Sequence, residues 1–135
     1  MGQFLAAADQ VPELALTSSA LRARDTLDLA RRQGNWNCKV AVSDAIYDSD
    51  TEGLLQLLHA HGKKPGSILL TGHEPTFSEM TSRLIGEHAN IRFSTGAMAR
   101  IDFDARNWAE VTFGSGELRW LVPPKLFTRA EYSFT

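Results

Sequence analysis

The sequence predicts an α/β fold: a mostly parallel sheet that is covered by helices on both faces and followed by a C-terminal β-meander. Two observations predict it. Up to Gly86, three short apolar strands alternate with amphipathic helices, an order that is typical of parallel sheets. Over residues 97–122, three alternating or apolar runs are separated by turn residues, an order that is typical of antiparallel strands.

Length and composition indicate an ordinary globular protein. The chain has 135 residues, of which 43% are hydrophobic and 22% are charged. We expect one domain over residues 1–125 and a C-terminal tail over 126–135. The formal net charge of −2 gives no general attraction to nucleic acid or to an anionic membrane, so neither is an expected partner. Any recognition of an anion must therefore come from a local cluster of donors.

The remaining bulk features exclude several kinds of protein. Cys38 is the only cysteine, so an intrachain disulfide is impossible and a paired-cysteine zinc site is not expected. We predict no metal and no cofactor. No apolar run approaches the roughly 20 residues of a membrane span, and the first ten residues lack the features of a secretory signal. A cytoplasmic protein is the expectation.

The first half of the chain alternates helix and strand. Ser18 or Ser19 is the expected cap of the second helix, and Gly34 is its expected end. The predicted elements are a short helix over 4–8, a strand over 13–18, a helix over 20–34 and a strand over 38–42. Residues 44–50 are predicted to be a loop.

The second half begins with a capping box, in which Ser49 and Glu52 would start a helix that ends near Gly62. Thr76 and Glu79 are a second predicted capping pair. The predicted elements are that helix, an interior strand over 67–72, a helix from Pro75 to Gly86, and strands over 97–103, 108–113 and 118–122.

Polar residues follow two of the predicted strands at the point where each one ends. In parallel sheets, ligands bind beyond the carboxyl ends of the strands. The first strand leads into Ser18 and then Arg22, in the first turn of a helix, and the third leads into His73. Helix N-termini, a guanidinium and an imidazole together would suit a phosphate or a carboxylate. Each residue also has a plain interpretation, since Arg22 could be a solvated side chain and His73 a loop residue.

The other polar candidates have structural interpretations. His59 and His61 lie on a helix without metal-ligand spacing, and we expect them, like His88, to be solvated. Asp48 belongs to an acidic cluster before a helix, where capping is its simplest role. Arg24 falls on another face of its helix from Arg22, so we interpret it as a surface residue.

The order of these segments resembles the histidine phosphatase superfamily, in particular its SixA-type phosphohistidine phosphatase branch. The resemblance covers nearly the whole chain, and "SALRARDT" and "GHEPTFSE" are its most specific parts. It implies that Arg22 grips the phosphoryl oxygens and that His73 is the second active-site histidine. Ser18 would lie near the pocket without a standard role. Many members have an acidic proton donor where this chain has Tyr47 and Asp48, which makes Asp48 a weak candidate.

One departure from the family is severe. Its members begin with a central strand and an Arg-His-Gly motif whose histidine is the nucleophile, and this sequence contains no Arg-His-Gly. The resemblance implies that roughly 30 to 40 preceding residues are missing, which would bring the chain to typical domain length. A start site placed too late, a fragment and a degenerate family member all remain open.

The sequence therefore leaves open whether the chain is an enzyme. The first hypothesis is a phosphatase acting on a phosphorylated protein, with phosphohistidine as the substrate group, or on a small phosphorylated molecule, although residues 1–135 alone should be inactive. The second is a pseudo-phosphatase that binds a phosphate ligand without cleaving it. The third is a subunit whose sheet accepts a strand from another chain.

Overall fold

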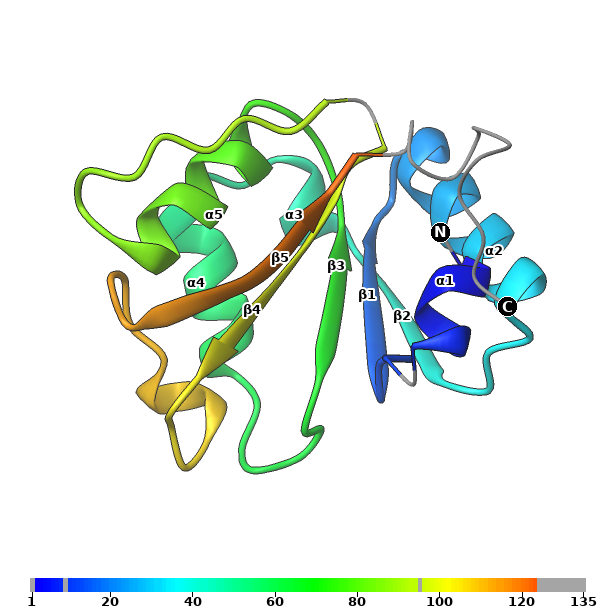
Figure 1. The fold of residues 1–135 in the computed structure, drawn as a ribbon, viewed down its shortest axis with the longest axis horizontal. Helices are drawn as coiled ribbons and strands as arrows, with labels where there is room; N and C mark the ends of the chain where they lie inside the picture. The colour runs from blue at the N-terminus through cyan, green and yellow to red at the C-terminus, as the bar shows by residue number, and fades with distance from the viewer. Residues whose placement is uncertain (1, 9, 95, 124–135) are drawn as a thin grey trace. The chain divides into compact units, whose positions relative to one another are not determined.

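The computed structural model describes residues 2–8, 10–94 and 96–123, which form two compact units (Figure 1). The first unit comprises the described residues up to Asp48 together with Pro65–Gly72. The second comprises Ser49–Lys64 together with the described residues that follow Gly72. The predicted tail over 126–135 lies outside the described residues, and a single domain over 1–125 stays a prediction.

The first unit is built on a three-stranded parallel sheet with the order β2-β1-β3. Strand β1 (Leu14–Ser18) pairs with β2 (Lys39–Ser43) on one side and with β3 (Ile68–Thr71) on the other. The α/β fold with a parallel sheet is therefore confirmed. All five residues of β1 are buried, as expected for an apolar strand with both faces covered.

Three helices belong to the same unit, namely α1 (Gly2–Ala7), α2 (Leu21–Gly34) and α3 (Asp44–Tyr47). Helix α2 buries Ala23 and Leu27, which are four residues apart on one face, and it contacts β1 and β3. Helix α1 packs against α2 (Figure 1). The indole of Trp36 is buried and donates a hydrogen bond to the Gly2 carbonyl at 3.1 Å, which fixes the start of α1.

Strand β3 differs from its prediction. Its sequence, Ile68-Leu69-Leu70-Thr71, is apolar on both faces and predicted an interior strand. In the structure it is an edge strand of the three-stranded sheet, and its four residues are only half-buried. The interior position belongs to β1, because β1 has hydrogen-bonded neighbours on both sides.

The second unit contains helices α4 (Thr51–His59) and α5 (Thr76–Ile85), which contact each other. Arg83 of α5 contacts two other segments of the unit. Its guanidinium lies 3.8 Å from the centroid of the Phe113 ring and 3.4 Å from the Glu52 carboxylate. The Gly114 N–H donates to the Arg83 carbonyl at 2.8 Å. Arg83 therefore holds the loop before the last strand against α5 and links α5 to α4.

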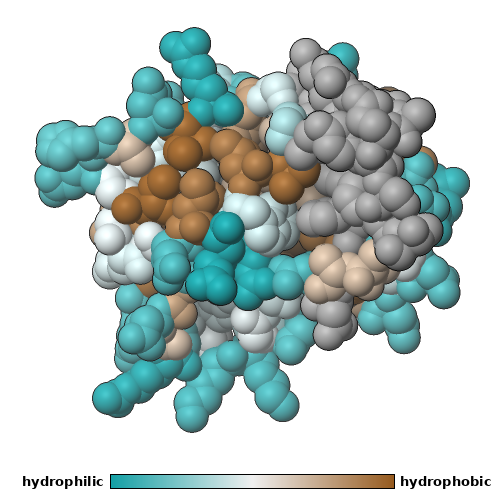
Figure 2. Space-filling view, viewed as in Figure 1, coloured by the Kyte–Doolittle hydropathy of each residue, from teal (hydrophilic) through white to brown (hydrophobic). Residues whose placement is uncertain are grey.

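An antiparallel pair completes the second unit, formed by β4 (Met98–Phe103) and β5 (Gly116–Val122). Both strands contact α5, and Gly116 permits a close approach, since a Cβ there would lie 2.5 Å from Ile101 Cγ2 and 3.0 Å from the Leu84 carbonyl oxygen. None of the six β4 residues is fully buried, and apolar surface is visible over this unit in Figure 2.

Several predicted elements are wrong. Residues 108–113 do not form a strand; a short 3₁₀ helix, η1 (Trp108–Glu110), lies there, so the predicted meander is a two-stranded hairpin with its own sheet. Its tryptophan packs edge-to-face on Phe103, with ring centroids 6.4 Å apart. The predicted loop over 44–50 contains α3, because the Ile46 side chain is 97% buried and gives that turn an apolar contact with the sheet.

The predicted helix caps are also replaced by neighbours in the sequence. Helix α4 is capped by Asp50 rather than Ser49, through a 2.8 Å hydrogen bond from the Gly53 N–H to the Asp50 carboxylate. Among the described residues, no helix is long and apolar enough to cross a membrane.

Candidate functional site

The carboxyl ends of β1 and β3 lie side by side in the first unit. The two strands are parallel and in register, so that Thr17 pairs with Thr71. The Thr71 hydroxyl donates to Thr17 Oγ1 at 2.6 Å and lies 3.3 Å from the carbonyl oxygen of Ala23 in α2. These contacts fix the place at which α2 begins relative to the ends of both strands.

Helix α2 begins without a capping side chain. Ala20 occupies the N-cap position, with φ −63° and ψ 141°, and no side chain of the described residues caps the helix there. Ser18 is fully buried, and its hydroxyl accepts a hydrogen bond from the Ala20 N–H at 3.2 Å, one position outside the helix. The prediction that Ser18 or Ser19 caps α2 is therefore wrong. Within the described part of the chain, the N-cap residue of α2 thus makes no side-chain hydrogen bond to the first turn, and helix starts of this kind can bind an anion.

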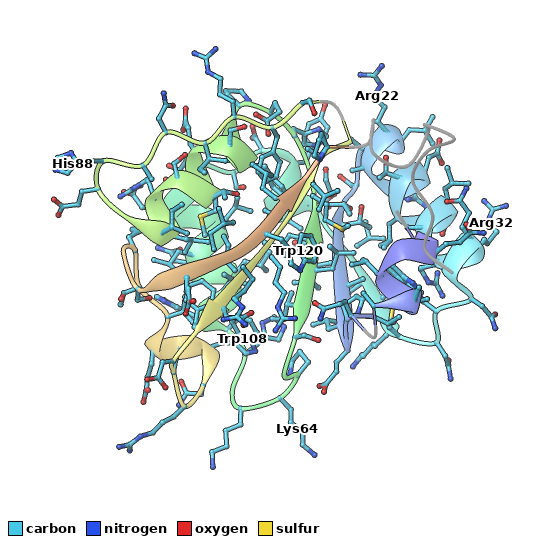
Figure 3. All side chains as sticks on the ribbon, viewed as in Figure 1. Arg22, Arg32, Lys64, His88, Trp108 and Trp120 are labelled. Atoms are coloured by element: carbon cyan, nitrogen blue, oxygen red, sulfur yellow. The ribbon has the colours of Figure 1, made fainter. Side chains whose placement is uncertain are left out.

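Arg22 stands in this uncapped turn. Its side chain is exposed and extends away from the ribbon (Figure 3). A guanidinium at the N-terminal end of a helix gains nothing from the helix dipole, whose positive end lies there. Its fork of five donors can, however, bind the same anion as the neighbouring backbone N–H groups.

His73 follows β3 by two residues and opens the segment that starts α5. Its side chain is half-buried, and its carbonyl oxygen accepts a 3.1 Å hydrogen bond from the Phe77 N–H. The next residue, Glu74, accepts a 3.1 Å hydrogen bond from the Ser78 N–H through its carboxylate, and that carboxylate also contacts the Ser78 hydroxyl. The predicted Thr76–Glu79 capping pair is therefore wrong, and Glu74 performs that function.

The structure places the four candidates in two groups. Arg22, Ser18 and Asp48 belong to the first unit, whereas His73 belongs to the second. Asp48 is exposed and follows α3 as its C-terminal cap residue. The roles predicted for all four residues stay predictions. Sequence reasoning missed Glu74, whose signal is an acidic residue four positions before a serine at the start of a helix.

The remaining histidines have other surroundings. His59 lies 2.6 Å from the Val111 carbonyl oxygen through Nε2, and His61 lies 3.2 Å from the Leu57 carbonyl oxygen through Nδ1, so the prediction that both are merely solvated is wrong. His88 is exposed, as predicted, and points outward (Figure 3). In the described part of the chain, no three His, Cys, Asp or Glu side chains are grouped closely enough to hold a metal ion.

Comparison with known proteins identifies the architecture. No protein-family model matches the chain, and no curated protein does either. Solved structures do match. A protein assigned as the phosphohistidine phosphatase SixA of Nakamurella multipartitia has a TM-score of 0.77 at 21% identity, covering 90% of this chain and 76% of its own. The protein histidine phosphatase SixA complexed with tungstate has a TM-score of 0.76 at 22% identity, covering 94% and 78%. The chain has the fold of the SixA-type histidine phosphatases.

A third SixA structure also matches the fold of this chain. The protein assigned as the phosphohistidine phosphatase SixA of Agrobacterium tumefaciens has a TM-score of 0.73 at 26% identity, and the match covers 91% of this chain and 75% of that one. The predicted resemblance to the SixA branch is therefore confirmed. This chain spans about three quarters of each SixA structure that it matches.

Proposed function

We propose that this chain binds a phosphoryl group at the carboxyl edge of β1 and β3, and that it is the phosphoryl-binding part of a phosphohistidine phosphatase. One observation carries the proposal. Two hydrogen-bonded parallel strands end side by side at Thr17 and Thr71, and the chain beyond them supplies an uncapped helix turn with Arg22 and then His73. Ligands of parallel sheets bind at this edge.

The donor set suits a tetrahedral oxyanion. Backbone N–H groups of α2, the Arg22 guanidinium and the His73 imidazole together offer positive charge and several directed hydrogen bonds. In phosphoryl transfer, such preorganised donors stabilise the charge that spreads over the equatorial oxygens in the transition state. The SixA structure that is complexed with tungstate shows that a protein of this fold holds an anion of this shape.

The reaction also needs a nucleophile. The resemblance to the family supplies one, a histidine in an Arg-His-Gly motif, which the sequence of residues 1–135 does not contain. Such a histidine would attack phosphorus in line, the phosphorus–nitrogen bond of the substrate would break, and water would then hydrolyse the phosphohistidine intermediate. The departing imidazole has a conjugate acid with a pKa of about 6.5, so it needs little help from a proton donor such as Asp48.

The proposed substrate is a phosphorylated protein carrying phosphohistidine, or a small phosphorylated molecule, in the cytoplasm. Phosphohistidine is favoured because the residues near Tyr47 and Asp48 offer no clear general acid, which an ordinary phosphate ester would require more strongly. The SixA proteins that match are named for phosphohistidine, which supports the same substrate class.

The experiment measures binding and turnover separately. Calorimetry with tungstate should detect binding by residues 1–135, and His73→Ala should weaken it about a hundredfold because a charged hydrogen bond to the anion is lost. His88→Ala, which changes an exposed histidine elsewhere, is the matched control and should bind as the wild type does. Equal affinities for His73→Ala and the wild type would overturn the proposed site.

The turnover arm uses a phosphoramidate. Residues 1–135 should hydrolyse it at the background rate, and a version extended by an upstream strand with Arg-His-Gly should hydrolyse it faster. Turnover by residues 1–135 that His73→Ala abolishes would overturn the need for a further nucleophile.

Binding without catalysis is the second candidate function. The observation that favours it is that residues 1–135 contain no Arg-His-Gly. A chain that binds tungstate but stays inactive when the strand and motif are restored would be a phosphate-binding pseudo-phosphatase. Activity in the extended chain would favour the phosphatase.

A further inference from the structure

At the start of α5, the side chains of Glu74 and Ser78 form hydrogen bonds with the helix start and with each other. One carboxylate oxygen of Glu74 accepts from the Ser78 N–H at 3.1 Å, and the other contacts the Ser78 hydroxyl. Ser78 is 7% exposed, and its hydroxyl oxygen also accepts from the Phe93 N–H at 2.9 Å. Glu74 is thus connected through a buried serine to the segment that precedes β4.

Backbone hydrogen bonds hold the chain on both sides of Glu74, directly after His73. The carbonyl oxygen of His73 accepts from the Phe77 N–H, and the carbonyl oxygen of Pro75 accepts from the Glu79 N–H, each at 3.1 Å. Glu74 lies between these two anchors, and its side chain adds the bond to Ser78. Because residue 74 follows the histidine directly, a loosened Glu74 would change the direction in which the imidazole of His73 leaves the backbone.

We propose that Glu74 is a positioning residue for His73, which it orients toward the phosphoryl group by clamping the first turn of α5. The proposal rests on the proposed function, since it assigns His73 an anion to face. Glu74 makes these contacts with both carboxylate oxygens and does so within its own segment. A direct role as a proton donor would need an oxygen turned toward the substrate, whereas both oxygens are turned toward Ser78.

The test uses three substitutions. Glu74→Ala removes both contacts. Glu74→Gln keeps a carbonyl oxygen for the Ser78 N–H and offers an amide N–H to the Ser78 hydroxyl oxygen. Glu79→Ala is the matched control, because Glu79 is the other acidic residue of this turn, is exposed and is not part of the clamp.

Two readouts are measured on residues 1–135: tungstate affinity by calorimetry, and the ring resonances of His73 by NMR. The chain has four histidines, so the His73 resonance is assigned by its loss in His73→Ala. Glu74→Ala should weaken tungstate binding about tenfold and shift the His73 resonances, because small misplacements of a binding group are costly. Glu74→Gln should stay within about twofold of the wild type, since it preserves the clamp.

The control separates positioning from charge. Removing a carboxylate near a bound anion should by itself strengthen binding slightly, so Glu79→Ala should bind tungstate as well as the wild type or better. Weaker binding by Glu74→Ala therefore cannot come from the lost charge. Should Glu74→Ala unfold, Ser78→Ala serves instead. It removes the hydroxyl contacts with Glu74 and with the Phe93 N–H but keeps the N–H bond to Glu74, so a smaller loss and a smaller His73 shift are expected.

The outcomes are distinct. Wild-type affinity together with unshifted His73 resonances in Glu74→Ala would overturn the positioning role, and so would a Glu74→Gln variant as impaired as Glu74→Ala. A wild-type chain that binds no tungstate would overturn the proposed function. The His73 resonances of the ligand-free variants would even then decide whether Glu74 orients the imidazole.

Discussion

Helices α2 and α5 both follow strands of the same parallel sheet, yet they begin in opposite ways. Among the described residues, no side chain caps α2 at its N-cap residue Ala20, and Arg22 lies in the first turn. Helix α5 starts with Glu74 bonded to the Ser78 N–H, so the N-terminal donor at Ser78 is satisfied by the protein itself. A capping side chain stabilises a helix by about 1 kcal/mol, and α5 has this stabilisation whereas α2 lacks it at its N-cap residue.

Under the proposed function, this difference assigns the anion to the N-terminal end of α2 rather than to that of α5. Donors that already have an acceptor, such as the Ser78 N–H, are poorly placed to bind an anion from solvent, whereas the open turn of α2 can accept one. In the proposed site the α5 end would instead contribute a side chain, that of His73, whose carbonyl oxygen accepts from the Phe77 N–H. The proposal thus assigns backbone donors to one helix and an imidazole to the other.

The largest loss of tungstate affinity is expected from substituting Arg22, because this removes the positive charge from the first turn of α2. Arg22→Ala should weaken tungstate binding about a hundredfold, because a bidentate charged contact is lost. Arg22→Lys should recover only part of the affinity, since an ammonium cannot reproduce the planar fork. Calorimetry measures both.

The matched control for this pair is Arg24→Ala, which removes an equal charge from the same helix. Arg24 is exposed and lies two residues along the helix, on a different face. It should stay within about twofold of the wild type at moderate salt, since exposed charges are largely screened. Equal losses for Arg22→Ala and Arg24→Ala would mean that only net charge matters.

A smaller effect is expected from making α2 resemble α5. Ala20 already has the extended backbone that an N-cap residue adopts, so Ala20→Asp can place a carboxylate over the first turn. The free energy of unfolding should rise by about 1 kcal/mol while tungstate affinity falls about tenfold, because the carboxylate competes for the same donors and repels the anion. Denaturant titration and calorimetry test the two changes in one variant.

Ala20→Ser refines this experiment, because a hydroxyl caps the turn without adding charge. It should give a similar gain in stability with a smaller loss of affinity. If Ala20→Asp raises stability and leaves tungstate binding unchanged, the open turn of α2 is not the anion site.

The order of elements was readable from the sequence, whereas the edges of the sheet and the caps were not. Strands β1 and β3 were both recognisable as apolar runs, but periodicity cannot say which one has neighbours on both sides. The burial of β1 and the edge position of β3 come from pairing between residues far apart in the chain. The run at 108–113 alternates like a strand, yet local backbone bonds such as Val111 N–H to the Trp108 carbonyl form a 3₁₀ turn there.

The N-cap residues were predicted wrongly for a local reason. Serine, threonine and aspartate all accept hydrogen bonds from a helix start, so neighbouring candidates compete and small backbone differences decide among them. Ser18 was a good candidate for α2, but its hydroxyl accepts from Ala20, one residue too early. For the same reason, the hydrogen bond from the Ser78 N–H to Glu74 was not predicted. Arg22 and His73 could be proposed as site residues from the sequence because each follows a strand end, a position that depends only on element order.

The smallest change in tungstate affinity is expected at α4, whose N-cap is not part of the comparison between α2 and α5. The Asp50 carboxylate accepts from the Gly53 N–H at 2.8 Å, which is an ordinary structural cap. Asp50→Ala should lower the free energy of unfolding by about 1 kcal/mol, as measured by denaturant titration, and leave tungstate affinity within about twofold. A tenfold gain in affinity would show that α4 also presents its first turn to the anion, and that the division of roles between α2 and α5 leaves out a third helix.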